Sequence, residues 1–253
     1  MPLRQLFPLS ATSSMQFLIP TTLSPRESLA LDEALLDELD AGIGVESLRV
    51  WEPGELFVVV GFANQVQSEA DVAACRDGGV PIFRRVSGGG TVLQGLGCLN
   101  YSVVLRIEEG GPLASVSGAN EFILGRVRAA LNPLVDGEIE LRGQTDLTMA
   151  GRKFSGNAQK RKRNALLFHG TLLLNFELGL IEKYLQMPSK QPDYRAGRGH
   201  ADFVTNLKLT AGEVAEALRE TWGALEASDE RPVAEVERLV REKYSKDEWN
   251  LRR

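Results

Sequence analysis

Apolar residues recur along this chain at two spacings, one typical of helices and one typical of strands. A repeat of three to four residues indicates amphipathic helices, and continuous or alternating runs of β-branched and aromatic residues indicate strands. The helices predicted in this way cover residues 25–41, 70–76, 119–131, 180–185, 211–222 and 233–244. The predicted strands cover residues 48–51, 56–60, 80–85, 101–106, 139–142, 147–149 and 165–175.

The start of the first helix has a recognisable signal. Ser24, Pro25 and Glu27 follow the order of a helix N-cap, a first-turn proline and a capping-box acid. Residues 1–24 are expected to be an irregular extension because three prolines interrupt them. With no internal repeat or low-complexity linker, residues 25–253 are predicted to form one α+β domain with a helical C-terminus and no separate C-terminal accessory domain.

Composition narrows the classes of partner. A net charge of −5 over 253 residues argues against nucleic acid or an anionic membrane as the main partner. Two cysteines make a disulfide framework implausible and fit a reducing compartment. The sequence contains neither an apolar run long enough to span a membrane nor a good signal peptide, so we expect a cytoplasmic location.

One glycine-rich stretch stands out between two strand-like runs. Phe83 to Val104 reads FRRVSGGGTVLQGLGCLNYSVV, with Gly88, Gly89 and Gly90 after two arginines and Ser87. The triplet is either a hairpin loop with a bulge or a place where a ligand approaches the backbone, and the arginines favour an anion or carboxylate site. It is not a Walker loop, because no Gly-Lys-Ser/Thr follows, and it does not open a helix.

A second stretch, Asp146 to Leu173, reads DLTMAGRKFSGNAQKRKRNALLFHGTLL. Lys153 lies between short strand candidates with glycines on both sides, so it is either a solvated lysine or an ammonium directed at a site. His169, one of two histidines, is in an apolar run and by itself reads as a core histidine. The basic run at residues 160–163 is a solvated loop or a docking point for an acidic protein.

Several kinds of catalytic site find little support. We see no persuasive Ser-His-Asp order, and two histidines with two cysteines cannot build an ordinary zinc site without carboxylates. Cys98, just after the glycine loop, is either a nucleophile or a small buried apolar residue.

Taken together, these stretches resemble the superfamily of lipoate-protein ligase A, octanoyltransferases and biotin-protein ligases. The resemblance covers most of the chain in order and is carried by the segments LALDEALLDEL, RVWEPGELFVVVGFANQ, RRVSGGGTVLQGLGCLNYS, GQTDLTMAGRKFSGNAQ, FHGTLLLNF, FVTNL and YSKDEWNLRR. It implies an α+β catalytic domain with a mixed sheet, related to class II aminoacyl-tRNA synthetases.

The resemblance also implies a reaction and its residues. ATP, with Mg²⁺, activates lipoate or octanoate to an acyl-adenylate, and the acyl group passes to a lysine of an apo lipoyl domain of a 2-oxoacid dehydrogenase or of the glycine-cleavage H protein. Lys153 matches the catalytic lysine, and Asp146 matches an acidic position near nucleotide and metal. The implied nucleotide-binding residues are Gly90, Thr91, Asp146 and Lys153. The implied substrate-binding residues are Arg85, Ser87, Gly88, Gly89, Gly90, Thr91, Val92, Ser155, Gly156, Ala158, His169, Gly170 and Thr171.

Two departures from the family pattern leave alternatives open. Gln94-Gly95 and Cys98 stand where many bacterial ligases have a His-Asp pair and an asparagine. The extra C-terminal domain of longer bacterial ligases is also missing from this sequence, so either a separate accessory subunit supplies it or activation is weak.

Three other functions compete with the ligase. An ATP-independent octanoyltransferase or amidotransferase with a catalytic cysteine would place it where this chain has Gly143, Gln144 and Thr145. A non-catalytic lipoate or nucleotide sensor would be expected to lose Lys153, which is present. Biotin ligation fits less well, because the glycine loop does not follow the Gly-Arg-Gly pattern of that branch.

Overall fold

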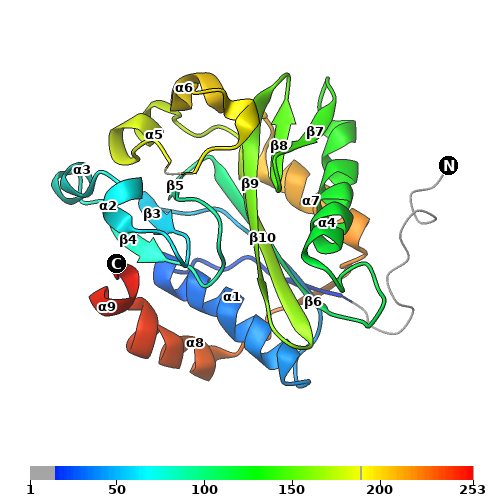
Figure 1. The fold of residues 1–253 in the computed structure, drawn as a ribbon. Coiled ribbons are helices and arrows are strands. Elements are labelled where there is room, and N and C mark those ends of the chain that lie inside the picture. Colours follow the sequence, from blue (N-terminus) through cyan, green and yellow to red (C-terminus); the bar gives the residue numbers. More distant parts are fainter. Residues whose placement is uncertain (1–14, 189, 253) are drawn as a thin grey trace.

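A computed structural model describes residues 15–188 and 190–252, and its centre is an eight-stranded mixed sheet (Figure 1). The strands, in order across the sheet, are β11 (Glu226–Ser228), β1 (Gln16–Leu18), β2 (Ser47–Trp51), β6 (Cys98–Arg106), β10 (Ala165–Leu173), β9 (Arg152–Arg161), β8 (Asp146–Met149) and β7 (Ile139–Arg142). β1 is parallel to both of its neighbours, and the other pairs are antiparallel. The expected α+β class with a mixed sheet is confirmed.

A second, three-stranded sheet has the order β4 (Ile82–Arg84), β3 (Phe57–Val60) and β5 (Val92–Gln94). The helices are α1 (Pro25–Asp40), α2 (Val66–Glu69), α3 (Val72–Asp77), α4 (Val116–Leu131), α5 (Gly179–Tyr184), α6 (His200–Phe203), α7 (Ala211–Trp222), α8 (Val233–Leu239) and α9 (Asp247–Asn250). Short 3-10 turns occupy Asn132–Leu134 and Asp193–Arg195. Within the part of the chain described here, no helix is both long and apolar enough to cross a membrane.

The two faces of the central strands meet different layers, because side chains alternate along a strand. On β6, Tyr101, Val103 and Leu105 belong to the core cluster that α4 and α7 cover. Val104 points the other way, into the cluster formed by α1 and the small sheet. The same second face of β6 and β10 carries polar residues, and these become part of the site described below.

The helix predicted to start after Ser24 is α1, and its capping box is formed. The backbone N–H of Ser24 donates to Glu27 Oε2 over 2.8 Å, and the Ser24 hydroxyl accepts from the Glu27 N–H. α7 is also predicted with its observed bounds. A turn at Ala150-Gly151 joins β8 to β9, with positive φ at both residues.

Some of the sequence predictions are wrong. Residues 16–18 form β1 rather than an irregular extension, because pairing with strands on both sides outweighs the nearby proline, while residues 1–14 lie outside the described part. α2, at Val66–Glu69, lies before the helix predicted at 70–76 and was not predicted. The helix expected at 233–244 changes at Val240 from α8 into a π-helical segment, Val240–Tyr244.

The basic run also differs from its prediction as a solvated loop. Lys160 and Arg161 lie on β9, and the Arg161 guanidinium donates to the carbonyl of Leu113 over 2.7 Å. Lys162 pairs with Asp37 over 2.7 Å. Most of this run is therefore engaged within the protein.

Candidate functional site

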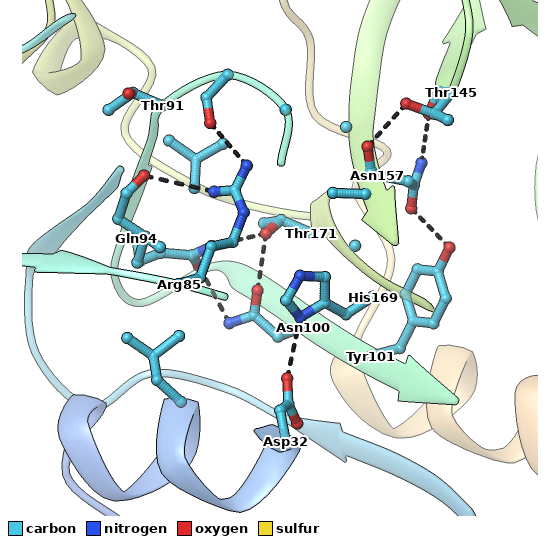
Figure 2. A pocket seen from close by; sticks show the side chains of 18 of the residues that line it. Asp32, Arg85, Thr91, Gln94, Asn100, Tyr101, Thr145, Asn157, His169 and Thr171 are labelled. Carbon is cyan, nitrogen blue, oxygen red and sulfur yellow. Dashed lines mark hydrogen bonds and ion pairs between the residues drawn. The ribbon is translucent and has the colours of Figure 1, made fainter. Parts of the chain in front are cut away.

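A cavity opens between the small sheet, α1 and the polar face of β6, β9 and β10 (Figure 2). Its walls combine apolar side chains with a few polar groups that converge, which is the usual composition of a small-molecule site. The apolar lining comes from Leu29, Trp51, Phe57, Val59 and Val92. The polar lining includes Asp32, Arg85, Gln94, Asn100, Tyr101, Asn157, His169 and Thr171.

Arg85 is the charged group on the glycine-loop side of this cavity. Its side chain is folded against the loop, with Nη2 donating to the carbonyls of Gly88 and Gly90 over 2.7 Å each and Nε donating to Ser87 Oγ over 3.0 Å. Burial lowers the pKa of the guanidinium to about 10, so it stays charged at neutral pH. Among the described residues no carboxylate pairs with it. A buried cation whose partners are all neutral is a suitable partner for an anionic ligand.

Within the glycine triplet, Gly89 is the position where a side chain would fit least well. Gly89 has a φ of +83°, in the left-handed region that favours glycine, and a Cβ there would lie 3.0 Å from the Arg85 Nη2 atom. Gly88 and Gly90 have ordinary φ values, and their carbonyls accept from Arg85. The loop is thus shaped around the arginine.

His169 is held between two other polar side chains. Its Nδ1 lies 3.0 Å from Asp32 Oδ2, and its Nε2 lies 2.6 Å from Ser87 Oγ. A Ser-His-Asp arrangement, which the sequence order did not suggest, therefore exists in three dimensions. Ser87 is fully buried and lies behind the cavity wall, so its hydroxyl is not placed to attack a ligand.

On the opposite wall, Lys153 of β9 lies at the boundary between this cavity and a second one. Its ammonium is 2.7 Å from Asp146 Oδ1, and the other oxygen of Asp146 accepts from the Tyr194 hydroxyl over 2.7 Å. Burial and the adjacent Asp146 raise the pKa of Tyr194, so the phenol keeps its proton and donates it. The two cavities share Gly90, Thr91, Val92, Thr145, Asp146, Lys153, Gly156 and Thr171.

Thr91 is a polar residue at this boundary. Its hydroxyl is buried and has no hydrogen-bond partner within residues 15–188 and 190–252, although the residue lines both cavities. Buried polar atoms are nearly always paired in native proteins. The oxygen itself has almost no accessible surface, so Thr91 marks the boundary by its position and not as a proven ligand contact.

The amide ring formed by Gln94, Asn100 and Thr171 occupies the position of one departure from the family pattern. Gln94 Nε2 donates to Thr171 Oγ1 over 2.6 Å, Thr171 donates to Asn100 Oδ1 over 2.7 Å, and Asn100 Nδ2 donates to Gln94 Oε1 over 3.1 Å. Each side chain thus donates a hydrogen bond to the next one in the ring. With glutamine at position 94, the polar groups of this wall are therefore paired with one another.

A second polar cluster connects β6, β9 and the segment before β8. The Tyr101 hydroxyl donates to Asn157 Oδ1 over 2.6 Å, and Asn157 Nδ2 donates to the Thr145 carbonyl over 2.7 Å. A Cβ on Gly170 would lie 1.7 Å from Asn157 Oδ1, so glycine at this position is what allows the cluster to form. Figure 2 shows Tyr101, Asn157 and Thr145 together on one side of the cavity.

The structure brings most of the predicted site residues to one place. The first cavity is lined by Arg85, Gly89, Gly90, Thr91, Val92, Asp146, Lys153, Gly156, Ala158, His169, Gly170 and Thr171, and the second also by Ser155. Ser87 and Gly88 line neither cavity and lie behind Arg85. Asp32, Asn100, Tyr101, Thr145, Asn157 and Tyr194 are lining residues that the sequence reasoning did not single out. Of these, Asp32 had a signal, since it is a carboxylate on the apolar face of a predicted helix.

Neither cysteine is placed for nucleophilic chemistry. Cys75 and Cys98 are both buried, and neither lines the two cavities. Burial raises the pKa of the Cys98 thiol to about 12, so it carries almost no thiolate at neutral pH. Of the two interpretations of Cys98, the structure supports the small buried apolar residue.

The site offers little to hold a metal ion by itself. The residues that the structure describes include no group of three or more His, Cys, Asp and Glu side chains that could bind a metal. Asp146 is the carboxylate at the boundary, and both of its oxygens already have partners. One carboxylate is enough for Mg²⁺ only when phosphate oxygens and water complete its shell.

The family model of the lipoyl protein ligase A/B catalytic domain matches residues 24–221. The chain belongs to this family. Lipoate-protein ligase A subunit 1 of Thermoplasma acidophilum is 26% identical over 250 residues, covering 92% of this chain and 95% of that protein. A relative from Schizosaccharomyces pombe, described as a lipoate-protein ligase A, is 36% identical over 62% of this chain, which spans only 41% of that longer protein. Octanoyltransferase LipM of Brevibacillus brevis is 26% identical over 94% of this chain and 99% of that protein.

Solved structures of ligases in this family share the fold. The bi-partite lipoate protein ligase of Thermoplasma acidophilum has a TM-score of 0.79 and 23% identity, covering 94% of this chain and 96% of that chain. A lipoate-protein ligase A bound with ATP has a TM-score of 0.77 and 26% identity, covering 94% of this chain and 98% of that chain. The recognition of this family from the sequence is confirmed.

Proposed function

We propose that this protein is a lipoate-protein ligase, which activates lipoate or octanoate with ATP and transfers the acyl group to a lysine of a lipoyl domain. The observation that carries the proposal is Arg85, a buried guanidinium at an apolar cavity with no carboxylate partner among the described residues. A fatty-acid-like ligand supplies both an anion for the arginine and an apolar tail for the walls formed by Leu29, Trp51 and Phe57.

The two connected cavities suit two substrates. In this proposal the acyl tail occupies the first cavity and the nucleotide occupies the second, so that the acid and the α-phosphate meet beside Lys153 and Thr91. A carboxylate oxygen attacks the α-phosphorus, a new O–P bond forms, and the bond to pyrophosphate breaks. The Lys153 ammonium, already 2.7 Å from Asp146, offsets the negative charge that develops there.

In the second step the neutral amine of the acceptor lysine attacks the acyl carbon. A C–N bond forms, AMP leaves with the electrons of the C–O bond, and the new amide nitrogen loses its extra proton to solvent. Lys153, which lines both cavities, again stabilises the anionic leaving group. Asp146 is the residue proposed to help position Mg²⁺ with the nucleotide.

Relatives support both substrates. One solved structure of the Thermoplasma acidophilum protein contains bound lipoic acid, and a lipoate-protein ligase A has been solved with ATP. The Thermoplasma acidophilum system is described as a bi-partite ligase with an E2 lipoyl domain. We propose by analogy that this chain also acts with a separate accessory subunit, and that its acceptors are lipoyl domains of 2-oxoacid dehydrogenases or of the glycine-cleavage H protein.

An octanoyltransferase is the second candidate, because LipM proteins are among the relatives. Transfer through a thioester needs an accessible thiolate. Both cysteines of this chain are buried away from the cavities, and Thr145 occupies the region where the sequence comparison would place such a cysteine. This favours the ATP-dependent route.

The test is an acylation assay. Purified protein with ATP, Mg²⁺ and lipoate is expected to add one lipoyl mass to an apo lipoyl domain, with and without a candidate accessory subunit. Lys153→Ala is expected to lower the rate about 100- to 1,000-fold, the usual cost of removing one preorganised charge-stabilising group. Lys246→Ala serves as the control, because Lys246 is exposed and lines neither cavity. Acylation from an octanoyl carrier protein without ATP would instead establish the second candidate.

A further inference from the structure

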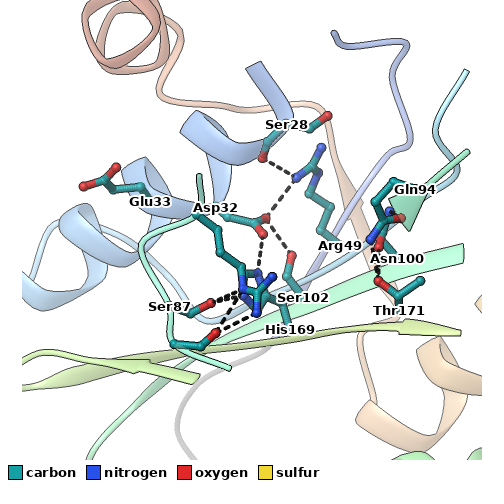
Figure 3. Close-up of polar contacts among 12 residues, drawn as sticks. Ser28, Asp32, Glu33, Arg49, Ser87, Gln94, Asn100, Ser102, His169 and Thr171 are labelled. Carbon is teal, nitrogen blue, oxygen red and sulfur yellow. Dashed lines mark hydrogen bonds and ion pairs between the residues drawn. The ribbon is translucent and has the colours of Figure 1, made fainter. Parts of the chain in front are cut away.

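Asp32 is a buried carboxylate of α1 whose role extends beyond pairing with its neighbours. Its Oδ1 accepts from Arg49 Nη1 and from Ser102 Oγ, each over 2.9 Å, and its Oδ2 lies 3.0 Å from His169 Nδ1 (Figure 3). Despite burial, contacts with His169 and Arg49 lower the pKa of Asp32, so it is an anion that only accepts hydrogen bonds.

From Asp32 an unbroken series of hydrogen bonds reaches the glycine loop. His169 Nε2 lies 2.6 Å from Ser87 Oγ, Arg85 Nε donates to the same Oγ over 3.0 Å, and Arg85 Nη2 donates to the Gly88 and Gly90 carbonyls. The series joins a helix, a central strand and the loop, three parts of the chain that are far apart in sequence.

The chemistry of the groups assigns the direction of each bond. Because Asp32 only accepts, His169 Nδ1 donates to it, and in the neutral tautomer with that proton Nε2 accepts from the Ser87 hydroxyl. The Ser87 oxygen then accepts from Arg85. Both nitrogens of His169 are thus engaged, and neither is left to act on a ligand.

Charge balance explains why Arg85 remains available to an anion. Arg49 pairs with Asp32 over 2.9 Å, so the negative charge of Asp32 is already compensated on the side away from the cavity. The hydrogen bond to Ser87 connects Arg85 to this network and orients its guanidinium. No carboxylate of the described chain neutralises the Arg85 charge.

We propose that Asp32 is a positioning residue, which acts through His169 and Ser87 to fix the Arg85 guanidinium and the glycine loop in the geometry that receives the acyl carboxylate. The inference rests on the proposed function, in which Arg85 meets the acid. Ser87, in the same series, belongs to this positioning network and does not serve as a nucleophile.

Two buried serines allow a controlled test. Ser87→Ala removes two hydrogen bonds of the network, to His169 and from Arg85, whereas Ser102→Ala removes one, to Asp32, and only Ser87 lies on the path to Arg85. Ser87→Ala is expected to raise the KM for lipoate about ten-fold, with the KM for ATP unchanged. Ser102→Ala is expected to leave both constants within about two-fold, with a loss of thermal stability no larger than that of Ser87→Ala.

Asp32→Asn extends the test along the same path. The change keeps the shape of the side chain but removes the negative charge that accepts the Nδ1 proton of His169. The KM for lipoate is therefore expected to rise at least as much as in Ser87→Ala. If this variant does not fold, the serine pair decides alone. Equal shifts of the KM for lipoate in the two serine variants, or no shift in either, would overturn the positioning role.

Calorimetric titration with octanoate separates this inference from the proposed function. If the wild type binds octanoate but transfers no acyl group, the ligase proposal fails, while weaker binding in Ser87→Ala than in Ser102→Ala still supports the positioning network. If the wild type is active but both serine variants bind octanoate equally, only the network is wrong. Absence of both activity and octanoate binding in the wild type would overturn both.

Discussion

The two charged sides of the cavity are built in different ways. On the glycine-loop side, Arg85 is buried and donates to two loop carbonyls and to the Ser87 hydroxyl. Ser87 is connected to Asp32 through His169. On the other side, Lys153 keeps 27% of its side-chain surface exposed and is held by one carboxylate, which is itself held by Tyr194 from the segment before α6. Several hydrogen bonds thus hold the first cation in place, whereas a single ion pair holds the second.

This contrast fits the two tasks in the proposed reaction. Binding the carboxylate benefits from a preorganised cation, because little ordering then remains to oppose binding. Meeting a phosphate, and later an incoming amine, requires a cation that can leave Asp146. Removing groups from each side should therefore change different kinetic constants.

The largest effect is expected from Arg85→Gln. The change removes the buried cation, and kcat/KM for lipoate is expected to fall about 100- to 1,000-fold, mostly through KM. Arg85→Lys keeps the charge but loses the planar fork, so its kcat/KM for lipoate should lie between those of the wild type and Arg85→Gln. Steady-state acylation at varied lipoate concentration measures this. A KM within two-fold of the wild type in Arg85→Gln would remove the arginine from acid binding.

Tyr194→Phe should have a smaller effect with the opposite pattern. It removes the donor to Asp146, so Lys153 and Asp146 are less well ordered, and kcat is expected to fall about three- to ten-fold with the KM for lipoate unchanged. Tyr184→Phe, on α5, is the matched control. A change confined to the KM for lipoate would contradict the division of tasks between the two sides.

Acid should reveal the buried side through stability. The folded-state pKa of Asp32 lies below its ordinary value of 3.8, so its contribution is fully present above that value and is lost as the pH falls through the lower folded-state pKa. The free energy of unfolding of the wild type should therefore decrease more steeply than that of Asp32→Asn as the pH falls below about 4. Denaturant titrations at several pH values measure the two slopes. Parallel curves would show that the pKa of Asp32 is not lowered in the folded state.

The smallest effect is expected at Cys98. Because its thiol is fully buried and its pKa is raised to about 12, Cys98→Ala should leave acylation within about two-fold and cost only about 1 kcal/mol of stability from the small space left behind. The acylation assay and a thermal melt check both. A loss of transfer without a loss of folding would return the cysteine to the mechanism.

The sequence by itself determined the parts that depend on local order. The capping box at Ser24 and Glu27 and the helix at 211–222 follow from the residues present, because caps and periodicity act over a few positions. The segments FRRVSGGG and GRKFSGNAQ were likewise enough to indicate the family and to mark Arg85 and Lys153.

Only the tertiary structure decided how these segments meet. β1 is a strand because two parallel partners from distant parts of the chain complete its hydrogen bonds, which its three-residue sequence cannot predict. Asp32, His169 and Ser87 come from a helix, a strand and a loop, so their contact depends on packing rather than spacing. Arg84 and Arg85 are both buried, but Arg85 lines the cavity, whereas Arg84 donates to the carbonyls of Gly61 and Asn64. Long-range burial and pairing assign these roles, and neither can be read from residues that are adjacent in the sequence.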